Sequence, residues 1–329
     1  HPDDIENLSR NVVNSWKNSF NFKEEDIETN TIGLRKPQIG AIHSILGHLT
    51  NATEIATVVL PTGTGKTETM LSVLVANRCK KLLVVVPSDA LRGQLAGKFY
   101  DLGWLKKIDN EGNSIVLEKA KYPKVGILNT GFSDEEELNF FIEKCNVIVA
   151  TMDLLTSMSI QQKKSLTEKC SHLFVDEAHH SKAKSWNKFI KSFDKNKVVL
   201  FTATPYRNDG QLLDGKIIYN FTLKEAQEQG YFKEIDFIPI REYDQKIADL
   251  KIAETAVNKL REDIANGYEH ILMARCEDKY RADEVFEIYS QHTDLNPVKI
   301  YSNLKGQSSI KQNIIDKQHK IIVCVDMLG

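Results

Sequence analysis

The chain has 329 residues, of which 41% are hydrophobic and 27% are charged, and its formal net charge at pH 7 is −2. That length can bury the cores of two domains, and the near-neutral charge excludes a general attraction to polyanions, so any nucleic-acid binding must come from local groups. No apolar run approaches the ~20 residues that span a bilayer, and the N-terminus has no apolar signal-peptide core. We therefore expect a cytoplasmic protein with no membrane partner.

The five cysteines form no C-x-x-C pair, which favours reduced thiols in the core. They are Cys79, Cys145, Cys170, Cys276 and Cys324. A zinc cluster made by Cys170, His172, His179 and His180 is the alternative, which is disfavoured because these residues lie on and after a buried strand.

Residues 1–33 are predicted to form an N-terminal lead-in, with apolar residues such as Val12 and Trp16 spaced as on one amphipathic helix. Pro37 then fits the first turn of a second helix, from which Gln38 would project. A glutamine amide offers a donor and an acceptor to the edge of an adenine, although an exposed glutamine without a ligand is the common alternative.

The sequence from Ala56 to Asn77 predicts a strand, a glycine-containing loop and a helix. Gly63 and Gly65 let backbone N–H groups point inward, and the positive end of the following helix faces the same point, so the loop favours an anion. Lys66 adds a cation that can reach the β and γ phosphates of a nucleotide, and the Thr67 hydroxyl lies where a Mg²⁺ ligand is needed. A leucine replaces the first glycine of the phosphate-loop template, so a tight turn with a chance Gly-Lys-Thr is the alternative.

The other apolar runs of this half predict buried strands with helices between them. These strands lie at 81–86, 124–128, 146–151, 172–176 and 197–202. The pattern predicts an α/β fold with a doubly wound parallel sheet. Ligands bind at the carboxyl ends of the strands in such sheets, where the loop at Gly63, the pair Asp176 and Glu177, and the run from Thr202 to Pro205 would meet.

Two adjacent carboxylates, Asp176 and Glu177, follow the strand at 172–176. Like charges at the end of an apolar strand are costly for stability alone, although an acidic helix start is an alternative. Beside a bound Mg-nucleotide, Asp176 would hold the magnesium through water, and Glu177 would orient and deprotonate the water that attacks the γ phosphate. His179 and His180 would form hydrogen bonds across the cleft at this edge of the sheet.

After a connector at 237–243 the pattern restarts in a second α/β unit, which has no phosphate loop. Strands are predicted at 270–274, 298–301 and 320–325, and helices at 246–266, 279–291 and 308–317. We therefore predict a lead-in at 1–33, a first ATP-binding domain at 34–230, and a connector with a second domain at 231–329. Because the chain begins at His1 and ends at Gly329 directly after a strand, we expect a piece of a longer protein.

Taken in order, these motifs resemble those of superfamily 2 helicases and translocases of the DEAD/DEAH-box type, as found in restriction-enzyme motor subunits and antiphage defence systems. The resemblance covers residues 34–329. It implies two RecA-like doubly wound domains in tandem, the second incomplete, with ATP and Mg²⁺ bound between them and nucleic acid running across both.

The resemblance also implies roles for individual residues. Arg35 and Gln38 match the Q-type adenine motif, and the run from Pro61 to Thr67 matches motif I, which adds Thr62 and Thr64 to the nucleotide-binding residues. Motif II carries the expected catalytic carboxylates, which act together with Lys66, while Thr67 and Asp176 are the expected metal ligands. His179 of motif II, with Thr202 and Thr204 of motif III, is expected to couple hydrolysis to strand movement.

Further motifs of the family imply contacts to a nucleic-acid backbone. The residues are Pro87, Arg92, Gln94, Thr151, Arg275 and Ser302. Motif V begins at Ile322 and breaks off at Gly329, and motif VI, whose arginines reach the γ phosphate, does not occur in the sequence. Because such an arginine raises the rate of nucleotide hydrolysis by a factor of ~10³ to 10⁵, we expect this chain to bind ATP but to hydrolyse it slowly.

The preferred function is an ATP-dependent helicase or translocase with DNA as the favoured track, acting as the motor of a larger antiviral defence or restriction protein. The alternative is an ATP-gated nucleic-acid-binding module that controls a partner effector, such as a nuclease, without unwinding. A motor that moves protein is disfavoured by the backbone-contact motifs. Two lysine-rich runs, 119–124 and 182–197, could support phosphate binding or form solvated surfaces.

Overall fold

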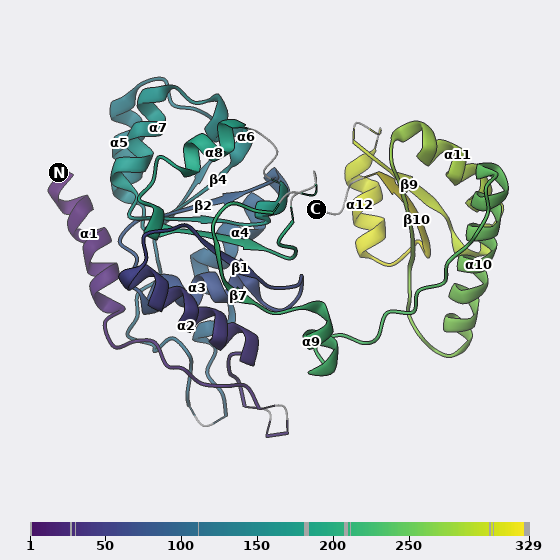
Figure 1. Ribbon diagram of the computed structural model, residues 1–329, viewed down its shortest axis with the longest axis horizontal. Helices are drawn as coiled ribbons and strands as arrows, with labels where there is room; N and C mark the ends of the chain where they lie inside the picture. Colours follow the sequence, from purple (N-terminus) through teal and green to yellow (C-terminus); the bar gives the residue numbers. More distant parts are fainter. Residues whose placement is uncertain are drawn as a thin grey trace. The chain divides into compact units, whose positions relative to one another are not determined.

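A computed structural model of the chain describes residues 2–26, 28–29, 31–110, 112–180, 184–206, 210, 212–302, 304 and 306–325. The chain divides into two compact units, His1–Glu234 and Ile235–Gly329. Each unit is built on its own β-sheet (Figure 1).

The first unit contains a seven-stranded sheet in the order β3-β4-β2-β5-β6-β1-β7. Every neighbouring pair in it is parallel. The strands are β1 (Ala56–Val59), β2 (Leu82–Val86), β3 (Val125–Leu128), β4 (Val147–Thr151), β5 (His172–Val175), β6 (Val198–Thr202) and β7 (Lys216–Asn220). The six strands expected in this half are confirmed, whereas β7 is an additional strand that pairs with β1 at the edge of the sheet.

Helices cover both faces of this sheet (Figure 1). On one face, α2 (Lys36–Asn51), α3 (Lys66–Ala76) and α4 (Asp89–Asp101) pack on the buried side chains of Val58, Val84 and Phe174. On the other face, α5 (Glu135–Lys144), α6 (Met152–Ser157), α7 (Ile160–Lys169) and α8 (Lys184–Ile190) pack on Val85 and Leu200. The side chains of alternate residues in each strand thus pack into opposite cores, and the doubly wound α/β fold is confirmed.

The N-terminal helix α1 (Pro2–Ser15) is part of the first unit and packs against α5. Val12 and Trp16 are buried in the same core as α2 and α3. The Asn146 side chain, immediately before β4, donates hydrogen bonds to the backbone oxygen of Ser9 at 3.1 Å and to its hydroxyl at 2.9 Å. The helix is therefore fixed by both apolar packing and buried hydrogen bonds.

The second unit has a three-stranded parallel sheet in the order β8-β10-β9. Its elements are α10 (Gln245–Ala265), β8 (Leu272–Cys276), α11 (Lys279–Tyr289), β9 (Val298–Ile300), α12 (Gln307–Ile315) and β10 (Ile321–Val325). The strands and helices predicted for this half are confirmed to within about two residues, as expected for element ends. Arg281 joins α11 to α10, because its Nη2 donates to both carboxylate oxygens of Asp249, at 3.0 and 2.8 Å.

The remaining segments connect these elements. Short helices lie at η1 (Gly103–Lys106), η2 (Ala178–His180), η3 (Lys195–Lys197), α9 (Leu223–Glu228) and η4 (Thr293–Leu295), and residues 235–242 form neither helix nor strand. All five cysteines are free and buried, as expected. Within the described part of the chain, no helix combines the length and the apolar character that crossing a membrane requires.

Candidate nucleotide and nucleic-acid site

The phosphate loop follows β1 and leads directly into α3. Gly63 and Gly65 have φ angles of +84° and +92°, which residues other than glycine rarely adopt. Thr64 is buried and its hydroxyl donates to the Pro61 carbonyl at 2.6 Å, which holds the loop closed, whereas Thr62 is exposed. The loop therefore has the backbone shape of an anion-binding site.

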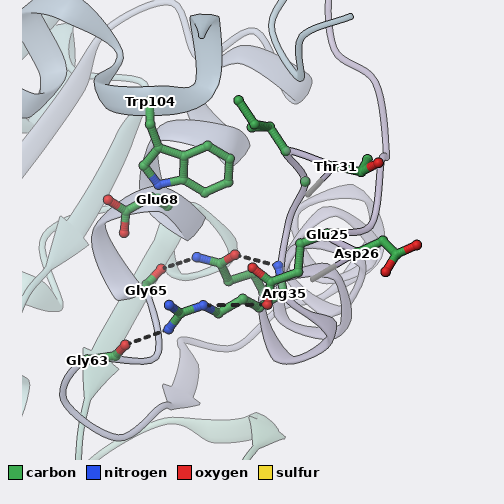
Figure 2. Close-up of a pocket in the computed structure, with 11 residues that line it drawn as sticks. Glu25, Asp26, Thr31, Arg35, Gly63, Gly65, Glu68 and Trp104 are labelled. Carbon is green, nitrogen blue, oxygen red and sulfur yellow. Dashed lines mark hydrogen bonds and ion pairs between the residues drawn. The ribbon is translucent and has the colours of Figure 1, made fainter. Parts of the chain in front are cut away.

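The residues of the Q-type motif are hydrogen-bonded to this loop (Figure 2). The Gln38 amide donates to the Gly65 carbonyl at 3.3 Å and accepts from the Arg35 backbone N–H at 2.8 Å. The Arg35 guanidinium donates to the Gly63 carbonyl at 2.9 Å. Gln38 is buried, so its amide has a fixed position between α2 and the phosphate loop.

A pocket of about 440 Å³ lies beside these residues and shares Gly63 and Gly65 with the phosphate loop. The indole of Trp104, from η1, lies across the pocket from Arg35 (Figure 2). Glu25 also lines it. Sequence reasoning missed both Trp104 and Glu25, because no local motif marks them.

The two carboxylates follow β5, and β6 lies between β5 and β1 in the sheet. Glu177 Oε1 is 2.8 Å from Lys66 Nζ, and Glu177 Oε2 is 3.4 Å from His179 Nδ1. The His179 ring is hydrogen-bonded to the Thr202 hydroxyl at 3.0 Å, and that hydroxyl donates to the Thr204 carbonyl at 2.6 Å. One series of polar contacts thus joins Lys66 of motif I, Glu177 of motif II and Thr202 of motif III.

Asp176 is 8% exposed, and one of its oxygens accepts the Glu177 N–H at 3.0 Å. Burial, followed by the neighbouring charge of Glu177, raises the pKa of Asp176 to about 6. Glu177 itself has a φ of +46°, an uncommon conformation for a residue with a side chain. Such strain is typical of functional positions.

The chemistry of the donors fits Mg²⁺. Magnesium is usually bound by one or two carboxylates together with substrate phosphates, and Asp176 with the Thr67 hydroxyl offers oxygen ligands of this kind. The described residues contain no group of three or more His, Cys, Asp or Glu side chains that could hold a metal by themselves. The zinc alternative has the further difficulty that the ring of His172 is hydrogen-bonded to Asn77 and Ser171.

The expected nucleic-acid residues of the first unit lie near the carboxyl ends of β2 and β4. Pro87 follows β2, and Thr151, the last residue of β4, pairs with the last residue of β2. Arg92 and the exposed Gln94 lie on α4, which begins just after Pro87. Arg92 forms an ion pair with Asp89 at 2.8 Å, so a phosphate would have to compete for it.

The other two expected nucleic-acid residues belong to the second unit. Arg275 lies in β8 and Ser302 follows β9, with β10 between these strands, and both side chains are exposed. Residues 182–183 of the second lysine-rich run and residues 326–329 of motif V lie outside the described residues.

Residues 31–207 match the family model described as the type III restriction enzyme, res subunit. The chain belongs to this family. The res-subunit match covers the phosphate loop, both carboxylates and the Thr202–Thr204 segment, and it excludes α1, β7 and the second unit. No curated protein matches the chain.

Solved structures were also compared. The chain is similar to T4 UvsW, with 15% identity, a TM-score of 0.43, and coverage of 96% of this chain and 61% of the UvsW chain. It is similar to S. cerevisiae Dbp5 bound to RNA and ADP BeF3, with 13% identity, a TM-score of 0.49, and coverage of 90% and 75%. The res-family chain therefore spans less than two thirds of the length of UvsW.

Proposed function

We propose that this chain is the ATP-hydrolysing part of a nucleic-acid motor, a helicase or translocase with DNA as the favoured track. The observation that carries the proposal is the series of contacts from Lys66 through Glu177 and His179 to Thr202. It connects the phosphate loop to Glu177, one of the two carboxylates, and then to Thr202, the last residue of β6. Membership of the res-subunit family supports the same function.

The geometry supports a separate chemical role for each residue of the site. Backbone N–H groups of the loop and Lys66 bind the β and γ phosphates. Thr67 and Asp176 would hold Mg²⁺, which neutralises charge that develops on the phosphates during transfer. Because Lys66 is paired with Glu177, an incoming γ phosphate would attract Lys66 and release Glu177 to orient the attacking water and take its proton.

We propose that His179 transmits that change to motif III. Its ring contacts a Glu177 oxygen and the Thr202 hydroxyl at once, so a movement of Glu177 alters the hydrogen bonding at the end of β6. Pro87, Arg92, Gln94 and Thr151 would bind a nucleic-acid backbone beside that edge of the sheet. We propose the same role for Arg275 and Ser302 in the second unit.

The family also favours a role as the motor of a cytoplasmic restriction or antiviral defence protein, with a nuclease or other effector as partner. The second candidate function is an ATP-gated nucleic-acid clamp that controls such an effector. The contacts from Lys66 through Glu177 and His179 to Thr202 favour it, since they would couple binding of the γ phosphate to a change at the end of β6 without requiring hydrolysis.

The test is steady-state ATP hydrolysis by this chain and by any longer form of the protein, with and without single-stranded DNA, duplex DNA and RNA. The control is Glu177→Gln, which keeps the size of the side chain but removes the base. We expect stimulation by DNA that disappears in the control. A strand-displacement assay separates the two candidates, because the clamp would bind DNA in an ATP-dependent way without displacing a strand. Hydrolysis unaffected by every nucleic acid would refute the motor.

A further inference from the structure

The pocket beside the phosphate loop has one flat apolar wall. Among the described residues that line it, Trp104 is the only aromatic one. The pocket shares Gly63 and Gly65 with the phosphate loop, and its volume of about 440 Å³ lies in the usual range for small-molecule sites. A group covalently joined to phosphates on the loop would enter this space.

Trp104 is held in place by the turn that precedes it. Leu102 and Gly103 both adopt left-handed backbone conformations, with φ angles of +59° and +55°, and so reverse the chain after α4. Leu102 and Leu105 are fully buried, and the Leu105 carbonyl accepts the Val116 N–H at 2.8 Å. The indole is therefore presented by a rigid turn and is itself only half-buried.

The same turn packs against α3, the helix that begins at the phosphate loop. A Cβ at Gly103 would lie 3.4 Å from a methyl group of Leu71, a buried residue of α3. Trp104 and the phosphate loop are thus fixed to one helix, so the distance between a bound phosphate and the indole is set by α3.

Gln38, which also lines the pocket, has hydrogen-bonding groups that suit the edge of one base. The Gln38 amide uses one N–H for the Gly65 carbonyl and one lone pair for the Arg35 N–H, which leaves one donor and one acceptor. A glutamine amide pairs with the N7 acceptor and the N6 amino group of adenine, whereas guanine presents acceptors at both N7 and O6.

We propose that Trp104 is the stacking wall for the adenine of the bound nucleotide. The proposal rests on the proposed function and adds a binding residue to it. A nucleobase stacks on an aromatic side chain through its π-face, while the Gln38 amide reads its edge. ATP should therefore be bound by two separate parts, the triphosphate by the loop and the base by Trp104.

The test compares equilibrium binding of ATP, GTP and inorganic tripolyphosphate by calorimetry. The variants are Trp104→Ala, Trp104→Phe, and Tyr100→Ala as a matched control, since Tyr100 is a 70% exposed aromatic residue of the adjacent helix α4 and does not line the pocket. We expect Trp104→Ala to weaken ATP about tenfold and to leave tripolyphosphate unchanged. Trp104→Phe should keep most of the ATP affinity, and the control should keep all of it.

Unchanged ATP binding in Trp104→Ala would overturn the proposal. An equal loss of ATP and tripolyphosphate would also overturn it, because Trp104 would then only support the loop. If the unaltered chain binds neither ATP nor tripolyphosphate, the proposed function itself fails, and the proposal for Trp104 fails with it. Quenching of tryptophan fluorescence by ATP that is lost in Trp104→Phe would give independent support.

Discussion

Gly65 joins the phosphate loop to the side of the site where we propose that adenine binds. Its φ is +92°, and a Cβ there would lie 1.9 Å from the Gln38 amide nitrogen. Gly65→Ala should therefore strain the loop and displace Gln38, which we expect to weaken ATP binding about tenfold or more. Calorimetry measures the effect, with Gly97→Ala as control, because a Cβ at Gly97 on α4 meets no atom within 4 Å. Equal ATP affinity in both variants would contradict the expectation.

His172 gives the first unit a predictable response to acid. Its Nε2 accepts from the Asn77 amide at 3.0 Å, and burial, followed by the charge of Lys197, lowers its pKa from 6.5 to about 4. Between pH 4 and pH 6.5 the unfolded chain therefore binds more protons than the folded chain. Neutral His172 makes its full contribution to the free energy of unfolding above pH 6.5. That contribution is lost as the pH falls through 4, which lowers the free energy of unfolding by about 3 kcal/mol.

Urea unfolding at pH 7 and at pH 4.5 measures this response. Acid also protonates carboxylates, so the informative quantity is the difference between the unaltered chain and His172→Gln, which cannot take up a proton. We expect the variant to lose less stability on acidification. Equal losses in the two proteins would show that His172 is protonated without penalty in the folded state.

At the scale of elements, Lys81 ties the start of β2 to the end of α5. Its ammonium group donates to the carbonyls of Ile142, Glu143 and Cys145 at 2.9, 3.0 and 3.1 Å. These carbonyls lie at the C-terminal end of the helix, where partners within the helix are lacking and a positive charge is favourable. Lys81→Met should lower the free energy of unfolding by about 1–3 kcal/mol.

Chemical denaturation measures that loss. Lys164→Met is the matched control, because Lys164 is 71% exposed and its ion pair with Glu168 on the surface of α7 should contribute at most about 0.5 kcal/mol. If both variants lose the same small amount, the three hydrogen bonds of Lys81 do not stabilise α5.

The strands with continuous apolar sequences were predictable, because a strand buried on both faces has few polar residues. The predicted run at 81–86 corresponds to β2, and its five residues are all buried. β7 escaped prediction because it is an edge strand whose side chains are mostly exposed, so Lys216–Asn220 lacks that signature. Only its pairing with β1 in the folded chain reveals it.

The site was predictable to the extent that its residues lie in local motifs. Lys66 and Glu177 were predicted from their own neighbours in sequence, and the structure places them 2.8 Å apart. Trp104 could not be found in this way, because its place in the pocket depends on the reversal at Leu102, a residue with no intrinsic preference for the left-handed conformation. Tertiary packing, which buries Leu102 completely, fixes that reversal.

At the scale of the whole molecule, the segment 235–242 should be the first site of proteolysis. It has no regular structure, Phe237 is 86% exposed, and nearby Tyr243 is fully exposed. Brief treatment with chymotrypsin, followed by mass spectrometry, should give two fragments that correspond to the two units. Phe237→Ser with Tyr243→Ser should slow this cleavage. First cleavage within α10 or the large sheet would contradict the expectation.

The position of β7 has a consequence for any shorter version of the protein. Residues 31–207 carry the family match and the motifs from Gln38 to Thr204, but they leave out β7 and α1. Without β7, β1 would become the outermost strand, with unpaired backbone groups along a fully buried apolar sequence. Such strands recruit strands of other molecules. A chain cut to the matched residues should therefore aggregate, although it keeps the phosphate loop and both carboxylates.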